Sequence, residues 1–121
     1  MTMTASQQFC VNLEHHGGEA NSGLTFALIE MLERVGFERR PRRTTLTFIR
    51  NGWTVVMSRT FEGGQMVVTF RLRGHTEPIV TVRPAEVRAL AQGSQSERLA
   101  AIEAALFDVV EALYLATEAA A

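Results

Sequence analysis

The chain has 121 residues, 46% hydrophobic and 21% charged, which is typical of one globular domain and not of a disordered chain. No apolar run approaches the roughly 18 residues that a membrane helix needs, and a single cysteine excludes an internal disulfide framework. The first eight residues lack the charged and apolar regions of a signal peptide, so we expect a cytoplasmic protein.

Charge is distributed unevenly along the chain. All 12 basic residues are arginines, and residues 34–88 hold 11 of them against four glutamates, a net charge of +7. Residues 1–33 and residues 89–121 each carry −4, which gives the formal net charge of −1. A basic middle between acidic ends indicates a binding surface, although codon bias is a second explanation for the exclusive use of arginine.

The N-terminal third predicts one strand and one helix. We expect residues 1–7 to be disordered and residues 8–13, in which apolar and polar side chains alternate, to form a short edge strand. Residues 21–22 can cap a helix that runs to about Val35, where Gly36 supplies the stop. Its apolar stripe consists of Leu24, Leu28, Met31, Leu32 and Val35.

The middle of the chain predicts two β-hairpins that share a strand. Two-residue loops at 51–52 and 63–64 are typical of tight hairpins; the first pairs Phe48 with Val55, and the second pairs Val55 with Leu72. The two registers agree and separate an apolar face from a polar face. The apolar face collects Leu46, Phe48, Trp53, Val55, Met57, Phe61, Met66, Val68, Phe70 and Leu72. The polar face collects Thr45, Thr47, Ile49, Thr54, Val56, Ser58, Thr60, Val67, Thr69, Arg71 and Arg73.

The C-terminal third predicts a further strand and two helices. Residues 79–82 form the strand, Pro84 opens a short helix over 85–92, and Gly93 ends it. A capping box at 94–97 starts a long helix. Its apolar stripe consists of Leu99, Ile102, Leu106, Val109, Leu113, Ala116 and Ala120. Residues 1–121 are therefore expected to form a single α+β domain. It would be an antiparallel meander sheet of four or five strands with an N-terminal helix and a long C-terminal helix packed on one face.

Two groups of arginines are candidate binding residues. Pro41 keeps the first group out of a helix, as a compact cationic loop, and the second group lies on the predicted polar sheet face. The candidates are Arg39, Arg40, Arg42, Arg43, Arg71 and Arg73. Guanidinium groups bind phosphates through bidentate hydrogen bonds and release counterions, which favours contact with phosphates or nucleic acid. The alternative is a solvated loop whose arginines pair with Glu30, Glu33 or Glu38.

The leading functional hypothesis is a small non-catalytic adaptor or inhibitor-type protein that docks a macromolecular partner, with a protein as the expected partner, through this arginine-rich surface. Nucleic-acid binding by the same surface is the alternative. The aromatic residues of the strands all fall on the apolar face, whereas sheets that bind single strands expose them for base stacking. An enzyme is the third hypothesis, because the sequence shows no pair of side chains that is recognisable as a general acid and a general base.

Other chemistry-bearing residues give weaker signals. Cys10, His15 and His16 lack the spacing that fixes a metal site, so no metal or cofactor is expected. Phe107 and Tyr114 lie seven residues apart on a second face of the long helix and need a cover. That cover is either the first helix or the second subunit of a homodimer.

Overall fold

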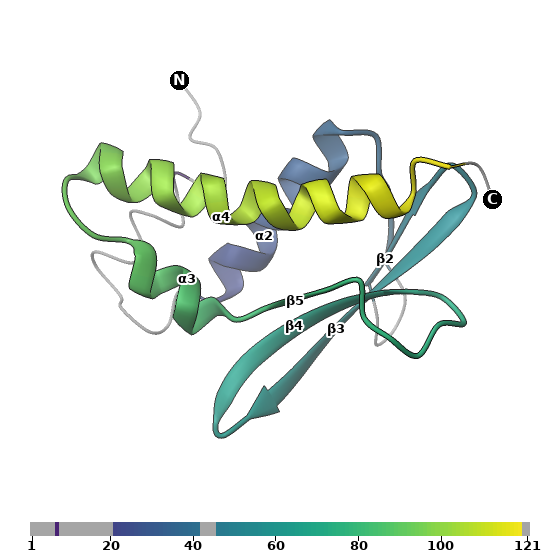
Figure 1. Ribbon diagram of the computed structural model, residues 1–121, viewed down its shortest axis with the longest axis horizontal. Coiled ribbons are helices and arrows are strands. Elements are labelled where there is room, and N and C mark those ends of the chain that lie inside the picture. The colour runs from purple at the N-terminus through teal and green to yellow at the C-terminus, as the bar shows by residue number, and fades with distance from the viewer. Residues whose placement is uncertain (1–6, 8–20, 42–45, 120–121) are drawn as a thin grey trace.

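Figure 1 shows the computed structural model of the chain, which describes Gln7 and residues 21–41 and 46–119. The described elements are α2 (Asn21–Arg34), β1 (Glu38–Pro41), β2 (Leu46–Arg50), β3 (Trp53–Glu62), β4 (Gln65–Leu72), β5 (Val80–Val82), α3 (Pro84–Leu90) and α4 (Gln95–Ala116). The strands form one antiparallel sheet in the order β1-β2-β3-β4-β5, and the helices lie on one side of it. The expected α+β meander with a long C-terminal helix is therefore confirmed.

The register of both hairpins is the predicted one. Phe48 pairs with Val55, and Val55 pairs with Leu72 on its other side. At the first turn Asn51 and Gly52 have φ values of 54° and 80°, and at the second turn Gly63 and Gly64 have 57° and 80°. Positive φ at both central positions defines type I′ turns, whose twist matches that of the strands.

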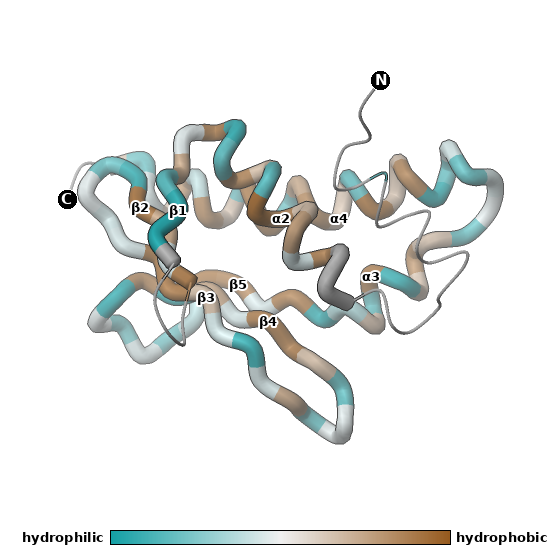
Figure 2. The backbone as a smooth tube through the Cα atoms, turned by 180° about the vertical axis from the view of Figure 1, so that it is seen from behind, coloured by the Kyte–Doolittle hydropathy of each residue, from teal (hydrophilic) through white to brown (hydrophobic). Residues whose placement is uncertain are grey.

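The core lies between the sheet and the helices. Phe48 and Phe70 are fully buried, with ring centroids 6.5 Å apart, and helices α2 and α4 cover them. Figure 2 shows hydrophobic residues along α2, α4 and β4, the elements that contribute to this core. The residues that the helices bury most fully are Leu24, Leu28, Leu32, Ile102, Leu106 and Leu113. Apolar burial of this extent is what fixes both helices on the sheet.

Helix boundaries follow the capping signals with one small difference. Pro84 is the first residue of α3, but this helix ends at Leu90, two residues earlier than predicted, because Ala91 leaves helical geometry. Ser94 and Glu97 form the predicted capping box of α4. Hydrogen bonds from the side chain and the backbone of Ser94 lower the pKa of Glu97. No helix in the described ranges is long and apolar enough to cross a bilayer.

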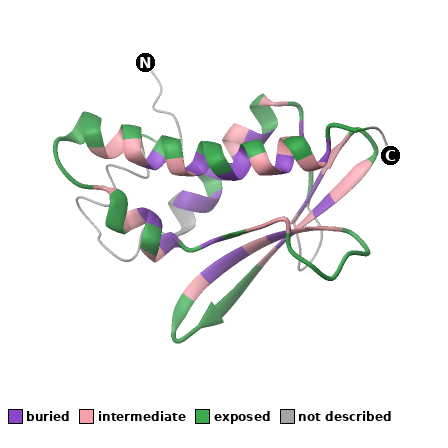
Figure 3. Cartoon of the chain, in the orientation of Figure 1, coloured by how far each residue is buried: buried purple, intermediate pink, exposed green. Residues whose placement is uncertain are grey.

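Two expectations are corrected by the fold. Arg39 and Arg40 belong to an edge strand, β1, and not to a loop. Pro41 ends this strand, where its missing N–H removes no bond from a central ladder. Phe61, expected on the covered apolar face, is 73% exposed, because β3 and β4 extend beyond the helices (Figure 3). Several other expectations lie outside the described residues: the disorder expected for residues 1–6, the strand at 8–13, and the positions of Thr45 and Ala120. Disorder was expected for Gln7 as well, but this residue is helical.

Candidate functional site: the outer face of the sheet

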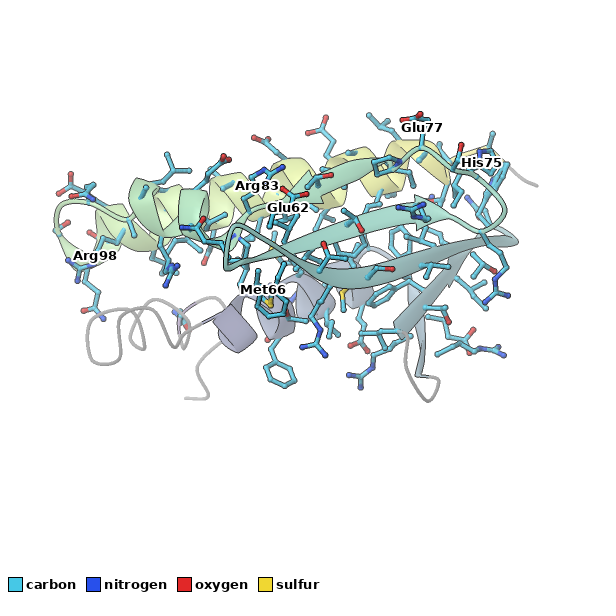
Figure 4. All side chains as sticks on the ribbon, turned by 90° about the horizontal axis from the view of Figure 1, so that it is seen from below. Glu62, Met66, His75, Glu77, Arg83 and Arg98 are labelled. Carbon is cyan, nitrogen blue, oxygen red and sulfur yellow. The ribbon has the colours of Figure 1, made fainter. Side chains whose placement is uncertain are left out.

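The sheet has one face toward the helices and one face away from them, which we call the outer face. Figure 4 looks onto it, with the helices behind the strands. The cross-strand register assigns its strand residues as Glu38, Arg40, Thr47, Ile49, Thr54, Val56, Ser58, Thr60, Glu62, Gln65, Val67, Thr69, Arg71 and Thr81. The predicted polar face is thus the outer face, and it consists mainly of threonine, serine, valine and charged side chains.

One row of residues crosses four strands of the outer face. Arg40 pairs with Thr47, Thr47 with Val56, and Val56 with Arg71. Neighbouring strands lie about 4.8 Å apart, which places the Cα atoms of Arg40 and Arg71 about 14 Å from each other. The Thr47 hydroxyl donates to the carbonyl oxygen of Arg40 at 2.8 Å, and is buried. The row therefore has an arginine at each end, with buried Thr47 and half-buried Val56 between them.

The C-terminal end of β4, past the residues that pair with the short edge strand β5, carries uncompensated positive charge. Arg71 donates to the carbonyl oxygen of Thr76 at 3.0 Å, which fixes its direction. Arg73 follows β4, is exposed, and continues the pairing with a backbone bond to Thr54 at 2.9 Å. Within the described residues, no carboxylate lies within 4.0 Å of either guanidinium. Both side chains are thus available to an acidic ligand.

The remaining arginines of this face are neutralised by neighbours. Arg40 forms an ion pair with Glu38 at 3.0 Å, and Arg83 forms one with Glu62 at 2.7 Å (Figure 4). The hydrogen bond to Glu62 and the charge of that carboxylate raise the pKa of Arg83. Strand β4 lies between the two residues of this second pair, and its residue Val67 is buried on the outer face. The alternative considered from the sequence, in which arginines pair with glutamates, thus holds for some arginines of the basic middle, Arg40 and Arg83 among them.

The six candidate arginines do not form one patch. Arg39 alternates with Arg40 along β1 and points to the helical side, where its guanidinium lies 4.0 Å from Glu33. Arg42 and Arg43 lie outside the described residues. The outer face thus holds Arg40, Arg71 and Arg73 of the predicted set.

The sequence analysis did not single out Arg50, although its side chain contacts several groups at the end of α4. It lies at the end of β2, its side chain is 14% exposed, and its guanidinium lies 3.9 Å from the ring centroid of Tyr114. It donates to the carbonyl oxygen of Thr117 at 3.1 Å and to the carboxylate of Glu118 at 2.9 Å. Cation–π contact and charge-assisted hydrogen bonds therefore hold the C-terminal end of α4.

Two neighbours of Arg50 complete this attachment, which we call the C-terminal clamp: Arg50, Asn51 and Trp53. The Asn51 amide donates to the carbonyl oxygen of Thr117 at 2.7 Å, and the Trp53 indole N–H donates to that of Ala119. A signal for the clamp exists in the sequence, because the last turn of α4 has no basic residue of its own. A helix C-terminus without a cation of its own attracts one from another part of the chain, because the helix dipole is negative at that end.

The clamp changes the environment of the predicted oligomer interface. Tyr114 is half-buried under Arg50, whereas Phe107 is 55% exposed. The two residues therefore do not present one joint apolar surface. Whether they take part in a homodimer stays a prediction.

Within the described ranges, no three His, Cys, Asp or Glu residues are grouped so that they could hold a metal. Cys10, His15 and His16 lie outside these ranges. The chain matches no protein-family model, no curated protein and no solved structure. The arrangement of side chains therefore carries the functional argument by itself.

Proposed function

We propose that the protein is a non-catalytic adaptor or inhibitor-type protein that docks an acidic protein partner through the outer face of its sheet. The observation that carries the proposal is the position of Arg71 and Arg73. Both lie at the margin of a sheet face that no described helix covers, and neither has a carboxylate within 4.0 Å in the described chain. The proposal places the protein in the cytoplasm, because a chain with a single cysteine has no internal disulfide and fits a reducing compartment.

The chemistry of the face fits a protein surface. Between Arg40 and Arg71 the half-buried side chain of Val56 is short, so it leaves room for a partner to approach. Arginine is enriched at protein interfaces because its planar fork matches a carboxylate and its stem covers apolar surface. Arg71, held by Thr76, loses less side-chain entropy when it binds.

Nucleic acid is the less favoured partner of this face. Phe48 and Phe70 are buried in the core, Trp53 belongs to the C-terminal clamp, and Phe61 points to the side of the sheet opposite to the outer face. Among the described residues, the outer face thus offers no aromatic ring on which a base could stack.

The test is capture from a lysate of the native host with a matched pair of variants. Arg71→Gln/Arg73→Gln removes two positive charges from the outer face. Arg34→Glu changes the net charge by the same two units on α2, at an exposed position on the helical side of the molecule. We expect proteins captured by the wild type to be retained by Arg34→Glu and lost from the double variant. Melting temperatures should be close to wild type, because exposed arginines contribute little to stability.

Two outcomes would count against the proposal. Capture of the same proteins at wild-type strength by Arg71→Gln/Arg73→Gln would remove the outer face as the docking surface. Capture that disappears after nuclease treatment would favour the nucleic-acid alternative. In that case, binding to a labelled oligonucleotide should also fall linearly on a log–log plot against salt concentration.

A further inference from the structure

Two exposed surfaces with apolar side chains remain outside the proposed docking face. The first is the end of the second hairpin, residues 59–65, which we call the β3–β4 arm. Every residue of the arm is exposed, and it extends beyond the helical layer (Figures 1 and 3). The second is the side of α4 that points away from the core, which we call the α4 outward face.

The arm combines an apolar ring with a free positive charge. Phe61 is 73% exposed, and Arg59 lies two residues earlier in β3, so both side chains are on the same side of the ribbon. Met66 is the cross-strand partner of Phe61. No carboxylate of the described chain lies within 4.0 Å of the Arg59 guanidinium.

The α4 outward face combines apolar side chains with free negative charges. From residue 100 onward, its exposed residues are Ala100, Glu103, Ala104, Phe107, Asp108, Glu111 and Leu115. Phe107 is 55% exposed and Leu115 is 64% exposed. Helical periodicity places Glu111 between these two, one turn from each. In the described ranges, no basic group lies within 4.0 Å of the carboxylates of Glu103, Asp108 or Glu111.

Like charges disfavour pairing of this face with itself. An antiparallel pair of α4 helices centred on Phe107 would bring Glu103 of each copy opposite Glu111 of the other. An antiparallel pair centred on Glu111 would bring the Glu111 carboxylates of the two copies together. Either arrangement places unpaired negative charges opposite each other in a partly desolvated contact, which is destabilising.

We propose that the α4 outward face of one copy binds the β3–β4 arm of a second copy. Phe61 packs between Phe107 and Leu115, and Arg59 approaches the carboxylates beside them. Charge complementarity is the reason for choosing a second copy as the partner. On the arm the exposed apolar side chain lies beside an unpaired positive charge, and on the α4 outward face the apolar side chains lie beside unpaired negative charges. The inference goes beyond the proposed docking of an acidic partner and uses a different surface.

The positions of the two surfaces determine the kind of assembly. In Figure 1, α4 runs along the top of the molecule and the arm extends from the bottom, so one pair of copies cannot satisfy both surfaces at once. The contact is therefore head-to-tail. One hairpin end on one helix buries less than the roughly 1,000 Å² of a stable specific interface. Association should thus be weak and should grow with concentration.

The test measures mass by analytical ultracentrifugation over a concentration series that reaches millimolar. The wild type should grow from the 13.4 kDa monomer to masses beyond a dimer. Phe61→Gln removes the arm contact, and Phe107→Gln removes the helix contact, so each variant alone should stay monomeric. An equimolar mixture should form a one-to-one pair and grow no further, because each variant supplies the half that the other lacks.

A matched variant controls for the loss of an exposed phenylalanine. Phe26→Gln removes a ring that is 61% exposed on α2, and its association should equal that of the wild type. Arg71→Gln/Arg73→Gln should also associate normally, which keeps this test independent of the proposed function. A wild type that stays monomeric at all concentrations, a mixture that does not pair, or an equal loss in Phe26→Gln would overturn the proposal.

Discussion

The two hairpins of the sheet share strand β3 and have loops of the same length, but they have opposite surroundings. The turn at Asn51-Gly52 lies against the C-terminal end of α4, and three of its neighbouring side chains form the C-terminal clamp. The turn at Gly63-Gly64 ends an arm whose residues are exposed on both faces. The comparison indicates that the local sequence decides whether a hairpin forms. Segments distant in the sequence decide whether that hairpin is packed against the rest of the molecule or exposed.

Replacing one phenylalanine in each hairpin gives the largest contrast. Phe48→Ala should lower the free energy of unfolding by about 3–5 kcal/mol, because it empties a fully buried site between the sheet and the helices. Phe61→Ala should change it by less than about 0.5 kcal/mol, as expected for an exposed side chain. Chemical denaturation of both variants is the measurement. Comparable losses would mean that the arm is covered within the monomer.

Removing one arginine beside each turn gives a smaller contrast. Arg50→Gln should cost about 2–3 kcal/mol, since it loses charge-assisted bonds to carbonyls at the end of α4 and the contact with Tyr114. Arg59→Gln should leave stability nearly unchanged, because no carboxylate of the described chain pairs with it. Thermal unfolding monitored by circular dichroism would decide this. A melting temperature of Arg50→Gln equal to that of Arg59→Gln would show that the clamp contributes nothing.

The turns themselves give the smallest effect. Gly52 has φ 80°, so Gly52→Val should destabilise by about 1–2 kcal/mol, the cost of a left-handed backbone for a residue with a Cβ. Gly63→Asn should be nearly neutral, because asparagine adopts φ 54° at the equivalent position of the first turn. No atom lies within 4 Å of a Cβ built at Gly63. Unchanged stability of Gly52→Val would contradict a strained type I′ turn.

Most of the fold could be predicted because its signals are local. The register follows from two-residue loops and the alternation of side chains, and the cap of α4 follows from Ser94 and Glu97. Strand β1 was not predicted, because a four-residue segment of three charged residues and a proline has no strand signal before β2 is placed beside it. Phe61 was misplaced, because alternation assigns a face to a residue but does not say how far the helices reach.

The candidate site could be predicted only in part. Arg71 follows from the register, whereas the separation of Arg39 from Arg40 depends on a strand that the sequence did not indicate. The ion pair between Arg83 and Glu62 joins segments 21 residues apart, and local patterns do not report such pairings. Which arginines keep a free charge is therefore a property of the assembled sheet.

Arg50 also has a consequence for the order of folding events. Its bonds to Tyr114, Thr117 and Glu118 join positions 64 to 68 residues apart, and they enclose strands β3 to β5 and helices α3 and α4. Closing so long a loop costs chain entropy that local hairpins do not lose. We therefore expect the clamp to form late, after the hairpin and the helix that it joins. Interactions that form after the transition state act on the rate of unfolding, so we expect this arginine to prolong the lifetime of the native state more than it speeds its formation.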